Sequence, residues 1–213
     1  MALLLLMTLV TLLGPRSGWL RRALPALWMA MVPSGVVLLA GGLGLLPVAS
    51  RDWGGLSLTL LLTAGSGVLA LPFGVMLAMG RQSALPVLRF ASAAYIETMR
   101  AVPLSAVLFF GQLLIPLFLP VGLELNRVLR AVVAFAVFAA AYIAEDVRGG
   151  LQAIPPTQVE AAAVLGLSPL QTMQLVVLPQ ALRIALPALT NQAVGLLQNT
   201  SLLAILGLVE LLG

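Results

Sequence analysis

The residues that could do chemistry are scarce in this chain and gather in two short acidic–basic clusters. Glu97 lies three residues before Arg100, and Glu145 lies three residues before Arg148. At that spacing each pair falls on one face of a helix and can form an ion pair. Such pairs more often fix the depth of a helix, although two opposite charges could also receive a zwitterion in passing.

Residue types that are absent narrow the chemistry further. The sequence contains no His, no Cys and no Lys. Without His and Cys we expect no metal site and no Ser–His or Cys–His nucleophile. Without Lys the chain cannot form a P-loop for a nucleotide. We therefore expect no catalytic residue and no cofactor in this chain, so that any ATP and Mg²⁺ would be bound by a partner subunit.

The composition predicts a membrane protein built from helices. Of 213 residues, 61% are hydrophobic and 8% are charged, whereas a soluble domain has about 25% charged residues. Uncharged stretches long enough to cross a bilayer cover 23–50, 53–80, 101–123 and 184–209, and a fifth can extend over 131–148. Stretches of this length are too long for barrel strands. The prediction is an all-α bundle with about five spans.

The arginines predict the orientation and the division of the chain. Alternating sides places eight of the eleven arginines on one face, which the positive-inside rule makes cytoplasmic: Arg16, Arg21, Arg22, Arg81, Arg89, Arg100, Arg148 and Arg183. Residues 1–22 form an N-terminal hydrophobic segment with an Arg-bearing cytoplasmic stretch. Residues 23–54 form the first full span and a short external loop, and 55–213 form the core. The hydrophobic start, 1–15, is either the end of a larger protein or a short surface helix.

A polar loop at 149–179 interrupts the hydrophobic pattern. Gly149 and Gly150 are expected to end the preceding span, and Thr157 with Glu160 has the spacing of a capping box at the start of a short helix. That helix should end at Gly166, the usual residue after a C-cap. Ser168 should cap a second helix, with Pro169 and Gln171 in its first turn. Pro179 should kink that second helix.

The same loop resembles a family motif. The EAA motif of ABC importer permeases has Glu-Ala-Ala, three residues, Gly, nine residues and then Ile-x-Leu-Pro. This chain has Glu160-Ala161-Ala162, Gly166 and Val176-Val177-Leu178-Pro179, with Val in place of Ile. The stretches "YIETMRAVPLSAVLFF" and "AAYIAEDVRGGLQAIPP" are similar to the polar and general L-amino-acid branch, and the resemblance covers roughly 35–213.

The resemblance implies a fold, a function and a set of partners. It implies a type I importer permease in the inner membrane, whose 157–168 helix couples to a separate ATPase subunit. The other implied partners are a second permease subunit, an extracytoplasmic binding protein and lipid, and no nucleic acid is expected. The residues that the motif assigns to ATPase coupling are Thr157, Glu160, Ala161, Ala162, Gly166, Leu178 and Pro179. Read locally, Glu160 needs no role beyond the capping box.

Polar side chains within the spans are candidates for a solute pathway, because such residues are costly in lipid. They are Gln112, Asn191, Gln192, Gln198, Asn199, Thr200 and Ser201. The alternative is that they form hydrogen bonds between helices. The branch usually has Lys at the position of Gln198 and a further span after "LVELLG", so the final span is expected to be missing. A truncated fragment that acts as a scaffold is therefore one alternative. A secondary transporter is another, although its intramembrane carboxylates are absent from the span centres.

Overall fold

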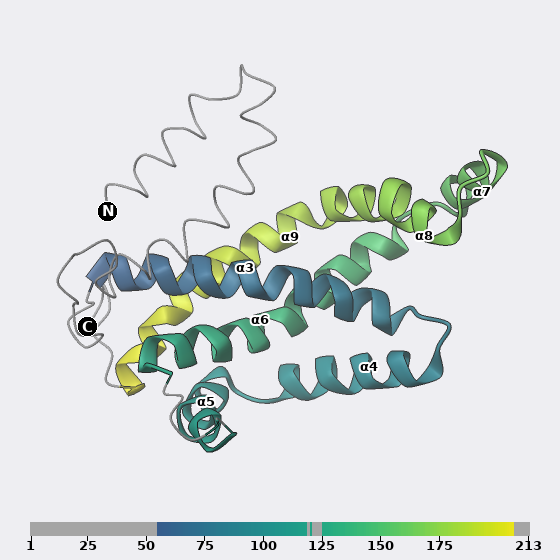
Figure 1. The fold of residues 1–213 in the computed structure, drawn as a ribbon. Coiled ribbons are helices and arrows are strands. Elements are labelled where there is room, and N and C mark those ends of the chain that lie inside the picture. Colours follow the sequence, from purple (N-terminus) through teal and green to yellow (C-terminus); the bar gives the residue numbers. More distant parts are fainter. Residues whose placement is uncertain (1–54, 119, 121–124, 207–213) are drawn as a thin grey trace.

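The computed structural model describes residues 55–118, 120 and 125–206, and within these ranges every regular element is a helix (Figure 1). The expected segment 1–22 and the expected span and loop over 23–54 lie outside the described residues. The prediction of a missing final span concerns the carboxyl end of the chain, where 207–213 are likewise outside them.

Three long helices form the bundle: α3 (Gly55–Arg81), α6 (Arg127–Gln152) and α9 (Leu178–Asn199). Helix α6 packs against both α3 and α9, and it holds more buried residues than any other described helix. Alanines dominate its buried positions, for example Ala139, Ala140 and Ala144, and small side chains let helices approach closely in a membrane. Segments Leu58–Arg81, Arg127–Gln152 and Pro169–Leu203 are each long and apolar enough to cross a bilayer.

The third predicted span, 101–123, contains a helix, α5 (Leu104–Phe118), that is shorter than predicted. It follows α4 (Pro86–Ala101), and the two form a pair bent by 108°. The break falls at Val102, whose backbone is extended (φ −94°, ψ 137°), because the residue before a proline avoids the helical region. Helix α4 packs along α3 and α6, so residues 86–101 belong to the bundle.

Polar side chains hold α3 and α4 against α6. The Ser66 hydroxyl donates to the carbonyl oxygen of Val132 at 3.2 Å, and the Tyr95 hydroxyl donates to that of Val137 at 2.7 Å. The Tyr95 ring also meets Phe73 edge-on, with 5.3 Å between the ring centroids. Through Tyr95, α4 is thus attached to both α3 and α6.

The polar loop lies at the end of the bundle where α3 and α6 finish (Figure 1). It contains α7 (Pro156–Val164), which projects beyond the long helices, and α8 (Pro169–Gln171). The chain returns through a π-helical segment, η3 (Thr172–Val177), into α9, and η4 (Thr200–Leu206) follows as a 3₁₀ helix. Helix α6 continues to Gln152, so the expectation that Gly149 and Gly150 end it is wrong.

Candidate functional site

The first helix of the loop begins earlier than the sequence predicts. Helix α7 starts at Pro156, its N-cap is Pro155, and no side chain caps it. Thr157 therefore lies inside the first turn, and the expected capping box with Glu160 is not formed. The physical reason is that Pro156 fits the first helical position, where its missing N–H costs nothing and its fixed φ is already helical.

The end of α7 is a Schellman turn, as the position of Gly166 predicts. The Leu167 N–H donates to the Ala162 carbonyl at 3.1 Å, and the Gly166 N–H donates to that of Ala163 at 3.0 Å. These two bonds define the motif, which places a left-handed residue between them. Gly166 has φ +77°, a conformation that carries no steric cost only for glycine.

The second helix begins at Ser168, the cap that the sequence predicts, and the cap takes the form of a capping box. The Gln171 N–H donates to the Ser168 hydroxyl at 3.3 Å, and the Ser168 N–H donates to the Gln171 side-chain oxygen at 2.9 Å. The irregularity expected at Pro179 takes the form of the π-helical segment just before it. There the Leu178 N–H reaches back five residues to the Met173 carbonyl, because Pro179 has no N–H for the carbonyl of Leu175.

Helix α7 presents an apolar surface to water at the end of the bundle. Ala162 is buried at 3% exposure, whereas Val164 is 87% exposed and Leu165 is 79% exposed. Of the other residues assigned to coupling, Thr157, Glu160, Ala161, Gly166 and Pro179 are exposed, and Leu178 is half-buried. If the loop lies outside the lipid, as the arginines predict, these exposed apolar side chains are a candidate surface for a protein partner.

A hydrogen bond that the sequence does not reveal ties α7 to the start of α9. The Gln180 amide donates to the Gln158 side-chain oxygen at 3.1 Å and to the Val176 carbonyl at 2.9 Å. Gln180 therefore bridges α7, the π-helical segment and α9. The two glutamines are 22 residues apart, so no local pattern pointed to the contact.

The predicted pathway residues on α9 and η4 differ in how far they are exposed. Asn191, Gln198 and Ser201 are exposed, whereas Gln192 and Asn199 are half-buried and Thr200 is buried; Thr190, next to Asn191, is exposed as well. The hydroxyls of Thr190 and Ser201 donate to backbone carbonyls of Leu186 and Gln198. Within the described part of the chain, the exposed amides of Asn191 and Gln198 have no hydrogen-bond partner. The exposed pair lies seven residues apart, on one helical face.

Gln112, the remaining pathway candidate, lies in an interhelical contact. Its amide donates to the carbonyl of Arg127 at 3.0 Å, and the Arg130 guanidinium donates to the Gln112 carbonyl at 2.8 Å. The two bonds join α5 to the first turn of α6. This geometry favours the interhelical alternative for Gln112.

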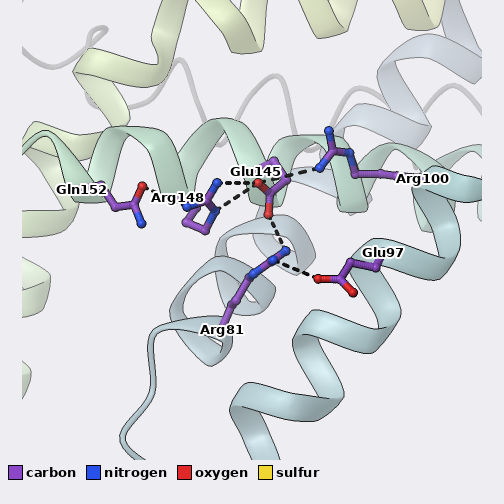
Figure 2. Close-up of polar contacts among 6 residues, drawn as sticks. All are labelled: Arg81, Glu97, Arg100, Glu145, Arg148 and Gln152. Carbon is purple, nitrogen blue, oxygen red and sulfur yellow. Dashed lines mark hydrogen bonds and ion pairs between the residues drawn. The ribbon is translucent and has the colours of Figure 1, made fainter.

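The two acidic–basic clusters come together into one ion-pair network (Figure 2). Glu145 pairs with Arg148 at 2.7 Å, as the spacing predicts. Glu97 pairs with Arg81 at 3.0 Å and not with Arg100, which approaches Glu145 at 3.7 Å. The expected pair of Glu97 and Arg100 is therefore wrong, because α3 and α6 offer each of them a partner from another helix.

Comparison with known proteins places this fold in a family. Residues 70–213, more than half of the chain, match the family described as binding-protein-dependent transport system inner membrane component. The chain belongs to that family. As one of these inner membrane components, it is a multi-pass protein of the inner membrane.

Relatives in this family are named as amino-acid permeases. The chain is 43% identical to the inner membrane amino-acid ABC transporter permease protein YhdY of Escherichia coli K12, over 87% of this chain and 51% of YhdY. It is 43% identical to the glutamate/glutamine/aspartate/asparagine transport system permease protein BztC of Rhodobacter capsulatus, over 79% of this chain and 39% of BztC. The chain thus spans about half the length of YhdY and less of BztC.

Other relatives match over more of their own length. The glutamate/aspartate import permease protein GltK of Escherichia coli is 36% identical over 86% of this chain and 78% of GltK. Among solved structures, an amino acid ABC transporter with histidines superposes with a TM-score of 0.63 at 28% identity, over 86% of this chain and 78% of that one. The inward-facing methionine transporter MetNI gives 0.62 at 28% identity, over 73% and 74%. The fold is that of an ABC importer permease.

Proposed function

We propose that this chain is the permease subunit of an ATP-driven amino-acid importer. It pairs with a second permease subunit, receives solute from an extracytoplasmic binding protein and docks a separate ATPase through α7. The observation that carries the proposal is the exposed apolar surface of α7, a short helix fixed by a Schellman turn and displayed beyond the bundle. The family and the names of the relatives support it.

The docking surface is formed by Val164 and Leu165 together with the exposed part of the EAA motif. Both side chains lie at the end of α7, next to the turn at Gly166. Burial of such side chains against a partner contributes about 25 cal/mol per Å² of apolar area. Ala161 adds a small side chain beside them, which allows the partner's backbone to approach.

The solute pathway is formed by the exposed amides of Asn191 and Gln198. An unpaired amide that faces lipid is costly, so this face of α9 belongs against water, solute or the second permease subunit. Amide and hydroxyl groups can donate hydrogen bonds to the carboxylate of a zwitterion and accept them from its ammonium group. GltK is named for glutamate and aspartate, and BztC for these and their amides, so these four amino acids are the first substrates to test.

The test is uptake by the full-length gene product in proteoliposomes with a co-expressed ATPase subunit and binding protein. We expect accumulation of labelled glutamate, aspartate, glutamine or asparagine that needs ATP. Leu165→Ser should lower recovery of the ATPase on purified permease, while Ala153→Ser, an exposed change outside α7, should not. Uptake that proceeds without ATP would contradict the proposal.

The pathway has its own test. Asn191→Leu and Gln198→Leu should lower uptake while recovery of the ATPase stays unchanged. Leu197→Met, on an exposed apolar neighbour, is the matched control. Wild-type uptake with both amides replaced would show that this face of α9 contacts something other than solute.

The alternatives are less favoured by the structure. A secondary transporter would bind its coupling ion near the middle of the bilayer, whereas Glu145 and Asp146 lie close to the end of α6 that leads into the loop, and both oxygens of Glu145 are held by arginines. A scaffold without transport activity leaves the exposed amides of α9 without a role.

A further inference from the structure

Glu145 occupies a junction between three helices. Its side chain on α6 is 15% exposed. One carboxylate oxygen accepts from Arg81 of α3 at 2.7 Å, and the other accepts from Arg148 of α6 at 2.7 Å and 3.0 Å. Arg100 of α4 approaches the second oxygen at 3.7 Å and lies over the ring of Tyr142. Figure 2 shows the three guanidinium groups directed at this one carboxylate.

The contacts continue from this junction in two directions. Arg81 also donates to Glu97 of α4 at 3.0 Å, so a single guanidinium joins α4 to Glu145. Arg148 donates to the side chain of Gln152 at 2.9 Å, and Gln152 is the last residue of α6. Helix α7 begins at Pro156, directly after a short connection. The network thus runs from α4 through α3 to the base of the coupling loop.

The burial of the members differs along the network. Arg81, Glu145 and Arg148 have side chains that are mostly buried, whereas Glu97 is 68% exposed and Arg100 is 43% exposed. Exposed ion pairs contribute little to stability, and loss of one partner from a buried group leaves charges without compensation. The central contacts therefore form a firm link between α3 and α6, and the outer contacts attach α4 more loosely.

Stability alone does not explain such a junction, since apolar residues of the same volume can replace buried ion pairs without loss. Three helices that share one carboxylate have a defined relative position, and they move together when one of them is displaced. This is a property that a coupling device needs at the base of a docking helix.

We propose that Glu145 is a positioning residue that transmits movement of the coupling loop to α3 and α4. The inference rests on the proposed function, in which an ATPase moves α7. When α7 is displaced, the end of α6 moves with it, and Glu145 carries α3 directly and α4 through Arg81 and Arg100. Without the carboxylate, α6 moves alone and ATP hydrolysis no longer drives the bundle.

The test measures solute transported per ATP hydrolysed, in proteoliposomes with the full-length gene product, its ATPase and its binding protein. Glu145→Gln keeps the shape and removes the charge. We expect ATPase recovery and ATP hydrolysis to stay within twofold of wild type, while solute per ATP falls at least fivefold. Asp146→Asn is the matched control, a neighbouring carboxylate on the same helix for which the described residues form no ion pair, and its ratio should stay at the wild-type value.

Arg81→Gln provides a second arm, which removes the link to α3 and leaves Arg148 and Arg100 at the carboxylate. It should also lower solute per ATP, and the double variant should be no worse than Glu145→Gln, because groups that act through one junction are not additive. A wild-type ratio in Glu145→Gln overturns the inference. If Glu145→Gln fails to reach the membrane, a wild-type ratio in Arg81→Gln overturns it instead. Failure of the wild-type protein to bind an ATPase would overturn the proposed function itself, which is a different result.

Discussion

Gly150 of α6 lies directly against the backbone carbonyl of Ala181 in α9. A Cβ atom built on Gly150 would meet that carbonyl oxygen, and it would also lie 3.1 Å from the carbonyl carbon and 3.3 Å from the Cβ of Ala185. The backbone of α9 at Ala181 therefore occupies the space that a side chain on Gly150 of α6 would need. Gly149, the residue before, has nothing within 4 Å of the same built atom.

This contact predicts opposite results at neighbouring glycines. Gly150→Ala should destabilise the protein by about 1–3 kcal/mol, because the obstacle is backbone and cannot rotate away. Gly149→Ala should be neutral or slightly stabilising, since alanine is the better helix former. Thermal unfolding of both variants in detergent would measure the difference. Equal melting temperatures would show that α6 and α9 are not in close contact at this level.

The turn at Gly166 predicts an effect that depends on conformation and not on space. Nothing lies within 4 Å of a Cβ built there, and φ is +77°. Gly166→Val should cost about 1–2 kcal/mol, which reorients α7 and lowers recovery of the ATPase about fivefold or more.

Gly166→Asn is the control for this position, because asparagine tolerates the left-handed conformation. Recovery of the ATPase on this variant, normalised to the amount of permease in the membrane, should stay near wild type. If Gly166→Val bound the ATPase as well as wild type does, the loop would be only a turn between spans.

The two possible capping residues in the loop predict a clear contrast. Ser168→Ala should remove one half of a formed capping box and cost about 1 kcal/mol. Thr157→Ala should cost little, because the described structure gives Thr157 no capping bond. Hydrogen exchange would report this as faster exchange of the amides at 170–172 in the first variant alone. Faster exchange of the amides at 157–160 in Thr157→Ala would instead indicate that Thr157 does cap α7.

The positions of the arginines predict the topology. Arg81, Arg148 and α7 lie toward one end of the bundle, and Arg127 lies at the start of α6, toward the other. Because the chain has no native Cys, single cysteines at 160 and 127 can be labelled cleanly. An impermeant thiol reagent added to intact spheroplasts should react at 127 and not at 160. Labelling at 160 from outside would reverse the orientation.

Local structure in the coupling loop could be predicted from the sequence because its signals are local. The Schellman turn needs only a glycine after a helix, and the capping box needs only Ser168 and Gln171 three residues apart. Thr157 and Glu160 have the same spacing, but the helix starts at Pro156, two residues earlier than a cap at Thr157 would place it. The capping-box spacing therefore predicted a helix start correctly at Ser168. It failed at Thr157, because Pro156 already begins that helix.

Contacts between helices could not be predicted in the same way. Glu97 pairs with Arg81 because α4 turns back along α3 after the loop at 82–85, and nothing in the local pattern distinguishes that partner from Arg100. The bend at Val102 was readable from Pro103, but 101–123 has no charge, so hydropathy alone predicted a full span where the structure describes the 15-residue helix α5. The amide link between Gln158 and Gln180 likewise depends on how the loop folds back.

The π-helical segment Thr172–Val177 affects the direction in which the side chains of α9 point. A π turn accommodates one extra residue compared with an α turn, and one residue corresponds to a rotation of about 100° around a helix. The segment therefore absorbs one residue, and Asn191 and Gln198 point where they do because this turn is π-helical and not α-helical. Deletion of Gln174, within the segment, should let the turn close as an α turn and leave the amide face of α9 in place, whereas a one-residue deletion in the regular part of α9 before Asn191 would turn that face by about a quarter of a circle.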